Sequence, residues 1–209
     1  MLRGLLWCGV VGGPLFVVVF LVNDRIRDNY DPVRDFVSEA AIGPGGWVQI
    51  VNFLVTGSLF VAFGAGLSRA VSRWTGWLVI AFGAVLALSG VFVTDPAPHT
   101  VRTGHGIAHD VAGFLIFLVL MPAAAFVAAR WQPAPAGGAR AWRWGSRAVG
   151  VAVPVLFVLG GGIETATGVF QRLAIAVGWI WLAVLGLRAL RASTPSLVSA
   201  SSNERTAGQ

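Results

Sequence analysis

Six long apolar segments, separated by short polar stretches, dominate this sequence. Each segment approaches the ~20 residues that an α-helix needs to cross the hydrocarbon core of a bilayer. The segments are roughly Leu5–Val22, Trp47–Leu67, Trp74–Val93, Ala108–Ala129, Ala148–Phe170 and Leu173–Leu190. Because the backbone of a membrane span must satisfy its hydrogen bonds internally, the pattern predicts an all-α fold, a polytopic bundle of six transmembrane helices.

The residues within and between these segments predict finer features. In the first loop, Val33–Ile42 has the spacing of a short helix with one apolar side. Three glycines at seven-residue spacing, starting at Gly76, predict close packing of the third helix, and Pro122 predicts a kink in the fourth. We expect residues 1–191 to form the six-helix domain. The polar, Ser-rich residues 192–209 are expected to form a disordered cytoplasmic tail.

Composition supports the membrane class. Hydrophobic residues make up 56% of the 209 residues and charged residues only 11%, against about 25% charged in soluble domains. The formal net charge of +6 does not indicate nucleic-acid binding, because the basic residues flank apolar spans and no basic run is interleaved with aromatics. All 15 basic residues are arginine, and this bias is typical of a GC-rich bacterial coding sequence.

The distribution of arginine predicts the orientation in the membrane. With the N-terminus inside, ten arginines fall in the cytoplasmic segments and five in the outer ones, so the positive-inside rule places both termini in the cytoplasm. We therefore expect a multi-pass protein of a bacterial cytoplasmic membrane. Eight of the nine acidic residues then lie at the outer face.

The stretch Thr94–Gly113 holds all three histidines between two apolar segments. His105 and His109 are spaced i, i+4 on one face of a predicted helix start, with Asp110 beside them. This pattern can hold a metal ion such as zinc, with the aspartate as a further ligand or an orienting group. The alternative is a purely structural helix start, whose polar side chains hydrogen-bond the neighbouring loops.

Six spans bring the first, third and fifth loops to the same face, and this predicts a polar pocket there. Its predicted lining residues are Ser38, Glu39, Asp95, Asp110, Glu164 and Arg172. A solvated helix face is the alternative for Ser38 and Glu39. Glu164 and Arg172 are expected to pair with each other, and a clamp on a substrate headgroup is the second interpretation of these two charges.

Short motifs along most of the chain resemble those of the DUF998 family of bacterial and archaeal membrane proteins. The motifs are Ser38-Glu39, Val93-Thr94-Asp95-Pro96, the His105/His109-Asp110 helix start, and Gly168-Val169-Phe170-Gln171-Arg172. The resemblance implies a six-helix membrane fold and no particular activity. The serine, aspartate and histidines near one face are also similar to the alkaline ceramidase and adiponectin receptor group of membrane hydrolases. That group has seven helices with histidines in the last one, and here the last helix has none.

Three functions fit these observations. We favour an integral membrane protein whose outward-facing pocket binds a lipid headgroup, a small ligand or a partner. The second hypothesis is a membrane-embedded, metal-dependent hydrolase acting on lipid, and the third is a small-solute transporter. Membrane lipid is the expected partner, with a protein partner or a second copy of the chain as alternatives and no nucleic acid. The sequence does not identify catalytic residues.

Overall fold

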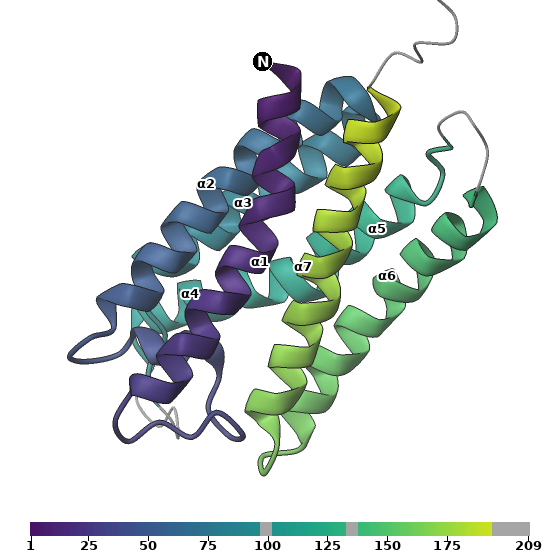
Figure 1. Cartoon of the computed structure of the whole chain (residues 1–209). Helices are drawn as coiled ribbons and strands as arrows, with labels where there is room; N and C mark the ends of the chain where they lie inside the picture. Colours follow the sequence, from purple (N-terminus) through teal and green to yellow (C-terminus); the bar gives the residue numbers. More distant parts are fainter. Residues whose placement is uncertain (97–101, 133–137, 194–209) are drawn as a thin grey trace, which may run out of the picture.

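The computed structural model describes residues 1–96, 102–132 and 138–193, and all its regular elements in these ranges are helical (Figure 1). The elements are α1 (Leu2–Ile26), η1 (Val37–Ala41), α2 (Trp47–Ala70), α3 (Arg73–Val91), α4 (Gly104–Phe114), η2 (Leu115–Leu120), α5 (Met121–Ala128), α6 (Ala139–Gly162) and α7 (Thr167–Ala192). The fourth span consists of α4, η2 and α5 in succession. All six spans are long and apolar enough to cross a membrane, so the chain is a multi-pass integral membrane protein.

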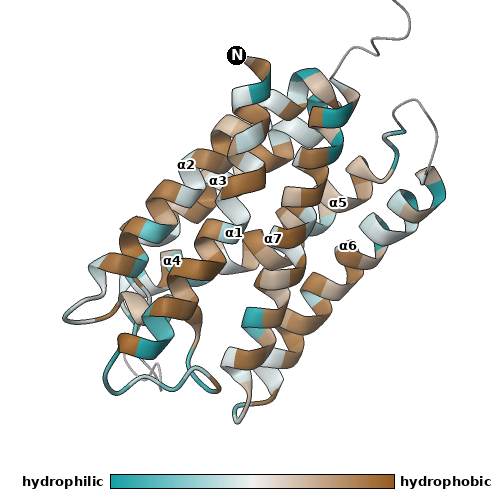
Figure 2. Cartoon of the chain, viewed as in Figure 1, coloured by the Kyte–Doolittle hydropathy of each residue, from teal (hydrophilic) through white to brown (hydrophobic). Residues whose placement is uncertain are grey.

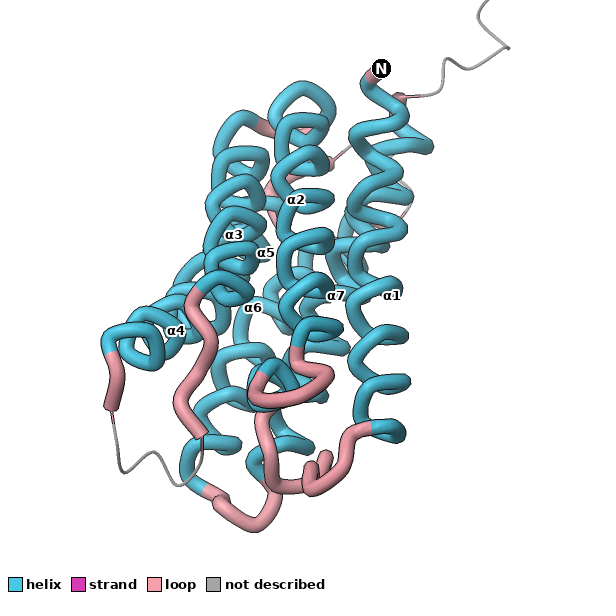
Figure 3. The backbone as a smooth tube through the Cα atoms, turned by 90° about the vertical axis from the view of Figure 1, so that its left-hand side faces the viewer, coloured by secondary structure: helices cyan, strands magenta, loops and turns pink. Residues whose placement is uncertain are grey.

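The spans form a closed ring. Going round it, α3 packs beside α2, α2 beside α1, α1 beside α7, α7 beside α6, α6 beside α5, and α5 beside α3 again (Figure 3). Both ends of the helical region, at Met1 and Ala192, lie at the same end of the bundle (Figure 1), which we call the termini end. Residues 27–46, 92–96 and 163–166 form the opposite end, which we call the loop end. The predicted tail lies outside the described residues, apart from its first two.

The indole of Trp179 on α7 forms the centre of the core. It is 1% exposed, and its ring lies 5.1–6.2 Å from the rings of four phenylalanines on four different spans. These are Phe16, Phe60, Phe82 and Phe117. Lipid is as apolar as the core, so van der Waals packing of this kind, and not removal from water, holds the spans together.

The predicted glycine stripe is confirmed at the interface between α2 and α3. A Cβ on Gly83 would lie 2.6 Å from the carbonyl oxygen of Gly57, and one on Gly64 would lie 2.7 Å from the carbonyl oxygen of Gly76. Such contacts require residues without side chains, so the glycines allow the two backbones to touch. Hydrophobic residues cover the middle of the spans, and hydrophilic ones gather toward both ends (Figure 2).

The largest differences from the sequence prediction lie in α6 and in the first loop. Helix α6 begins at Ala139 and ends at Gly162, so the last turn lies at residues 163–166 and Arg172 falls inside α7. The three consecutive glycines at the end of α6 favour termination there, because glycine is a poor helix former. The first-loop helix is a short 3-10 helix, Val37–Ala41, and not the full Val33–Ile42. Pro122 has no amide proton, so it cannot donate a hydrogen bond to the turn before it. The residues before it, Leu115–Leu120, form a π-helix in the middle of the fourth span.

Candidate ligand pocket

Two adjacent cavities that share part of their walls lie toward the loop end of the bundle. The larger, of about 320 Å³, is the outer chamber, and the smaller, of about 40 Å³, is the inner chamber. The residues shared by both walls are Ser38, His109, Gly113 and Gln171. Phe36, Phe114 and Phe157 add apolar surface to the outer chamber, and Phe16 and Trp179 close the inner one. We call the two chambers together the pocket.

His109 contributes an imidazole whose protonation pattern follows from its partners. The ring is buried, and Nδ1 lies 2.7 Å from the carbonyl oxygen of Phe92 and 3.2 Å from that of Ser89. A carbonyl oxygen can only accept, so Nδ1 carries the proton. In the neutral ring Nε2 is then a hydrogen-bond acceptor on a residue that lines both chambers. The Thr103 side chain caps the start of α4 by accepting a hydrogen bond from the Gly106 amide. Because the cap fixes where α4 begins, it also fixes the position of His109 on the helix.

Ser38 and Gln171 supply the other polar groups common to both chambers. Gln171 on α7 accepts a 2.7 Å hydrogen bond from the Val37 amide through Oε1, which fastens η1 to α7 and leaves its Nε2 amide as a donor. Ser38 is only 7% exposed and lines both chambers, so it offers its hydroxyl there to a ligand or to water.

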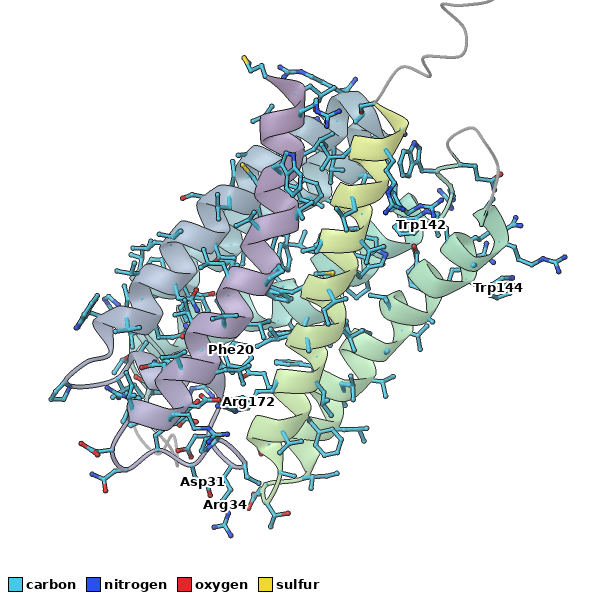
Figure 4. The ribbon with its side chains drawn as sticks, in the orientation of Figure 1. Phe20, Asp31, Arg34, Trp142, Trp144 and Arg172 are labelled. Carbon is cyan, nitrogen blue, oxygen red and sulfur yellow. The ribbon has the colours of Figure 1, made fainter. Side chains whose placement is uncertain are left out.

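Arg172 does not pair with Glu164, and this sequence prediction is wrong. Its Nε and Nη2 bond to the two carboxylate oxygens of Asp24, at 2.9 and 2.8 Å. Its Nη1 donates to the carbonyl oxygens of Asp35 and Gly168. Figure 4 shows Arg172 beside Phe20 of α1, whereas Glu164 is exposed in the turn after α6. The pairing follows from the ring of spans, which sets α7 against α1.

Tyr30 links this ion pair to the pocket. Its hydroxyl accepts from Arg172 Nη2 at 2.5 Å and donates to the Phe36 carbonyl oxygen at 3.0 Å, just before η1. Burial raises the pKa of the Tyr30 hydroxyl well above its ordinary value. Arg172, Asp24 and Tyr30 therefore hold the first loop in position over the pocket. Because the described polar neighbours already occupy its guanidinium, Arg172 is a positioning residue.

The remaining predicted pocket residues have separate partners. Glu39 accepts a hydrogen bond from the Phe36 amide at 2.7 Å and so stabilises the first turn of η1. Asp95 accepts from the amide and hydroxyl of Thr103, at 2.9 and 2.6 Å, and joins the end of α3 to the start of α4. Asp110 lines the outer chamber and forms a 2.6 Å salt bridge with Arg102.

The three predicted metal ligands lie in different environments. His105 is exposed, with its ring 5.5 Å from that of Phe92. His109 is buried and bonded to carbonyl groups, while Asp110 pairs with Arg102. Within residues 1–96, 102–132 and 138–193 there is no group of three His, Cys, Asp or Glu side chains suited to a metal ion. His99 lies outside the described residues. A zinc site at His105, His109 and Asp110 stays a prediction.

Sequence reasoning missed Gln171, Asp24 and Tyr30 as parts of this region. A signal was present for two of them, since Gln171 and Asp24 are polar residues in or at the ends of apolar segments, where such residues are costly. Nothing in the sequence indicates that Tyr30 turns inward, because it lies in a polar loop whose path depends on Arg172.

The fold and the cavity define the class of this molecule, a six-span membrane protein with a pocket within one end of its helix ring. The chain belongs to the DUF998 family of proteins of unknown function, whose family model matches residues 10–188. Neither the curated proteins nor the solved structures contain a match to this sequence.

Proposed function

We propose that the pocket binds a neutral amphiphile, a molecule with a hydroxyl- or ester-bearing headgroup and an apolar tail. The observation that carries the proposal is the set of three polar side chains common to the two chambers, Ser38, His109 and Gln171. They offer a hydroxyl, a ring acceptor and an amide donor. The outer chamber is at the lower end of the ~300–1,000 Å³ typical of ligand pockets.

The charges near the pocket favour a neutral headgroup over a phosphate. A phosphate needs an available cation. Arg172 is occupied by Asp24, Tyr30 and two carbonyl groups, and Arg102 is paired with Asp110. The aromatic rings around the chambers suit the apolar part of an amphiphile. Membrane lipid is therefore the proposed source of the ligand.

The hydrolase and transporter hypotheses have less support. A zinc hydrolase needs three protein ligands around one ion, and His105, His109 and Asp110 have three separate sets of neighbours. A transporter needs a path toward the other end, and the inner chamber ends against Trp179, the largest of the fully buried side chains. Binding requires neither feature.

We further propose that the loop end faces outward from a bacterial cytoplasmic membrane. The asymmetry of arginine supports this orientation under the positive-inside rule. The ligand would then reach the pocket from the outer leaflet or the outer solution.

The test is stabilisation of the purified protein by monooleoylglycerol, measured as the shift in thermal unfolding midpoint in detergent. The wild-type midpoint should rise with probe concentration. His109→Ala and Ser38→Ala should each weaken the apparent affinity by about tenfold, the effect of losing one buried hydrogen bond. His105→Ala is the matched control, since it changes an exposed histidine one turn away on the same helix, and it should respond like wild type.

Equal stabilisation of the wild type, His109→Ala and Ser38→Ala would overturn the proposal. Mass analysis of the recovered probe provides a second readout. Intact monooleoylglycerol is expected, and release of oleate by wild type but not by Ser38→Ala would favour the hydrolase instead.

A further inference from the structure

A groove with no lining residue in common with the pocket runs along the outside of the bundle between α6 and α7. Its volume is about 590 Å³. On α7 its wall extends from Leu173 to Arg188, which at 1.5 Å per residue is about 22 Å of helix. Leu173, Ile180 and Val184 in this wall are 41–59% exposed. Because both helices are membrane spans, the groove faces the acyl chains of the bilayer.

The groove is apolar except at one end. The two indole nitrogens of its wall have internal partners, since Trp142 Nε1 donates to the Ala128 carbonyl oxygen and Trp181 Nε1 donates to Ser146 Oγ. Arg188 is the one charged residue that lines it. The guanidinium of Arg188 lies over the Trp142 ring, 4.9 Å from its centroid, and its buried Nε has no hydrogen-bond partner in the described structure.

Charge at the termini end is unbalanced in the described residues. Nine arginines occur there, namely Arg3, Arg69, Arg73, Arg130, Arg140, Arg143, Arg147, Arg188 and Arg191. The acidic residues of the described chain are all at or near the loop end, the closest in sequence to Arg188 being Glu164 before α7. Among the described residues Arg188 therefore has no carboxylate from its own end of the bundle, and its buried Nε has no hydrogen-bond partner there. A partly buried guanidinium of this kind favours the binding of an anion.

We propose that this groove is a binding site for an anionic phospholipid, separate from the pocket. The phosphate binds Arg188 at the membrane boundary, and one acyl chain lies along the apolar wall toward Leu173. The dimensions agree, since one leaflet contributes ~15 Å of hydrocarbon and the wall is longer than that. Basic sites between helices are a known mode of anionic lipid binding, and arginine suits phosphate because its donors form a fork.

Trp142 and Trp181 give Arg188 a fixed platform. The two indoles are stacked, with centroids 6.1 Å apart and planes 12° apart. Figure 4 shows Trp142 on the side of α6 that faces α7, whereas Trp144 projects away from it. An arginine held on a ring loses less conformational entropy on binding than a freely moving one. This distinguishes Arg188 from Arg191, which lies about one turn further on α7, is exposed and does not line the groove.

The experiment compares dioleoylphosphatidylglycerol with dioleoylphosphatidylcholine, which have the same acyl chains. Delipidated full-length protein in neutral detergent is titrated with each lipid, and bound lipid is counted by native mass spectrometry. The wild type should retain the anionic lipid about tenfold more tightly. Arg188→Gln should abolish that preference, and the matched control Arg191→Gln should keep it.

A groove-filling variant, Ala176→Phe, tests the acyl site without altering any charge. It should lower the binding of both lipids at this site, and it also decides the question if Arg188→Gln does not fold. Equal affinity of the two lipids for wild type would overturn the proposal, as would equal losses in Arg188→Gln and Arg191→Gln, which would indicate a diffuse basic surface. A dimer that dissociates on Ala176→Phe would assign the groove to a second copy of the chain. None of these outcomes depends on monooleoylglycerol binding at the pocket.

Discussion

Arg172 shows how one side chain can organise a whole region of a membrane protein. Its ion pair with Asp24 is largely buried, with side-chain exposures of 13% and 5%. By contrast, the Arg34–Asp31 pair in the first loop has side-chain exposures of 67% and 52%. Exposed pairs contribute at most about 1 kcal/mol, whereas removing one partner of a buried pair costs about 3–5 kcal/mol. Arg172 is therefore the residue on which the first loop depends.

The partner of Arg172 can be identified by two double-mutant cycles on the free energy of unfolding. Arg172→Ala and Asp24→Asn should each destabilise strongly, and the double variant should be less destabilised than the sum of the two single variants, by a coupling of about 1–3 kcal/mol. The same cycle with Glu164→Gln should be additive. Reversible unfolding in mixed detergent provides the measurement. Coupling to Glu164 in place of Asp24 would contradict the observed pair.

Tyr30 predicts a dependence of stability on alkaline pH. It is the only tyrosine in the chain, and burial raises its pKa in the folded state. Above pH ~10 the unfolded chain ionises this group while the folded protein keeps the proton. Stability should therefore fall as pH rises past ~10, by up to about 1.4 kcal/mol per pH unit. Tyr30→Phe should lack this additional slope.

The absorbance of tyrosinate tests the same prediction directly. Because there is one tyrosine, the signal reports a single site. It should appear together with unfolding and not before. Tyrosinate formation near pH 10 in a protein that is still folded would show that the hydroxyl is accessible to water and not buried.

At the scale of elements, glycine and proline decide how the spans meet. The small residues on α2 and α3 bring two backbones into contact along the length of both helices. The π-helical turn before Pro122 carries Ile116 and Phe117, which line the inner chamber. The irregular backbone of the fourth span therefore lies beside the pocket, consistent with the general tendency of π-bulges to occur at functional sites.

The last two spans contribute to both proposed sites. Near its start, α7 carries Gln171 and Arg172, which fasten the first loop over the pocket. Near its end, it carries Arg188 over Trp142 of α6, which is stacked on Trp181 of α7. Helix α6 is the least buried of the six spans. This exposure leaves open the groove between it and α7.

At the scale of the whole molecule, the two ends of the bundle are chemically different. Among the residues that the structure describes, the loop end carries the acidic side chains and the pocket, and the termini end carries nine arginines. Under the proposed orientation the first faces outward and the second meets the cytoplasmic leaflet, where anionic lipids attract basic residues. The asymmetry thus fits the separation of the two proposed sites.

Cysteine labelling of intact cells tests the orientation. In a Cys8→Ser background, Asp28→Cys at the loop end should react with a membrane-impermeant maleimide. Ser193→Cys, just after α7, should react only once the membrane is permeabilised. The reverse pattern would place the pocket in the cytoplasm and the basic end outside.

The sequence by itself determined the membrane class, the number of spans, the family and the glycine contact of the third helix. These depend on hydropathy, length and residue spacing, which act within one segment. It also indicated that Ser38, His109 and Asp110 lie at the loop end. Two spans separate the first loop from the third, so both loops fall on the same side of the membrane. The alternative interpretation of residues 94–113, a helix start whose polar side chains hydrogen-bond the neighbouring loop, also has support, since the Thr103 hydroxyl donates to Asp95.

Only the tertiary structure decided which polar groups meet. Hydropathy is the same whichever way a helix is turned, so no pattern indicated that Arg172 would reach Asp24 and not the nearer Glu164. His105 and His109 share a helical face in sequence, yet the packing of α3 buries one and leaves the other exposed. The pocket and the groove are spaces between helices, and their residues come from segments far apart in the chain. Contact between distant segments depends on the order of the spans in the ring, which local periodicity does not encode.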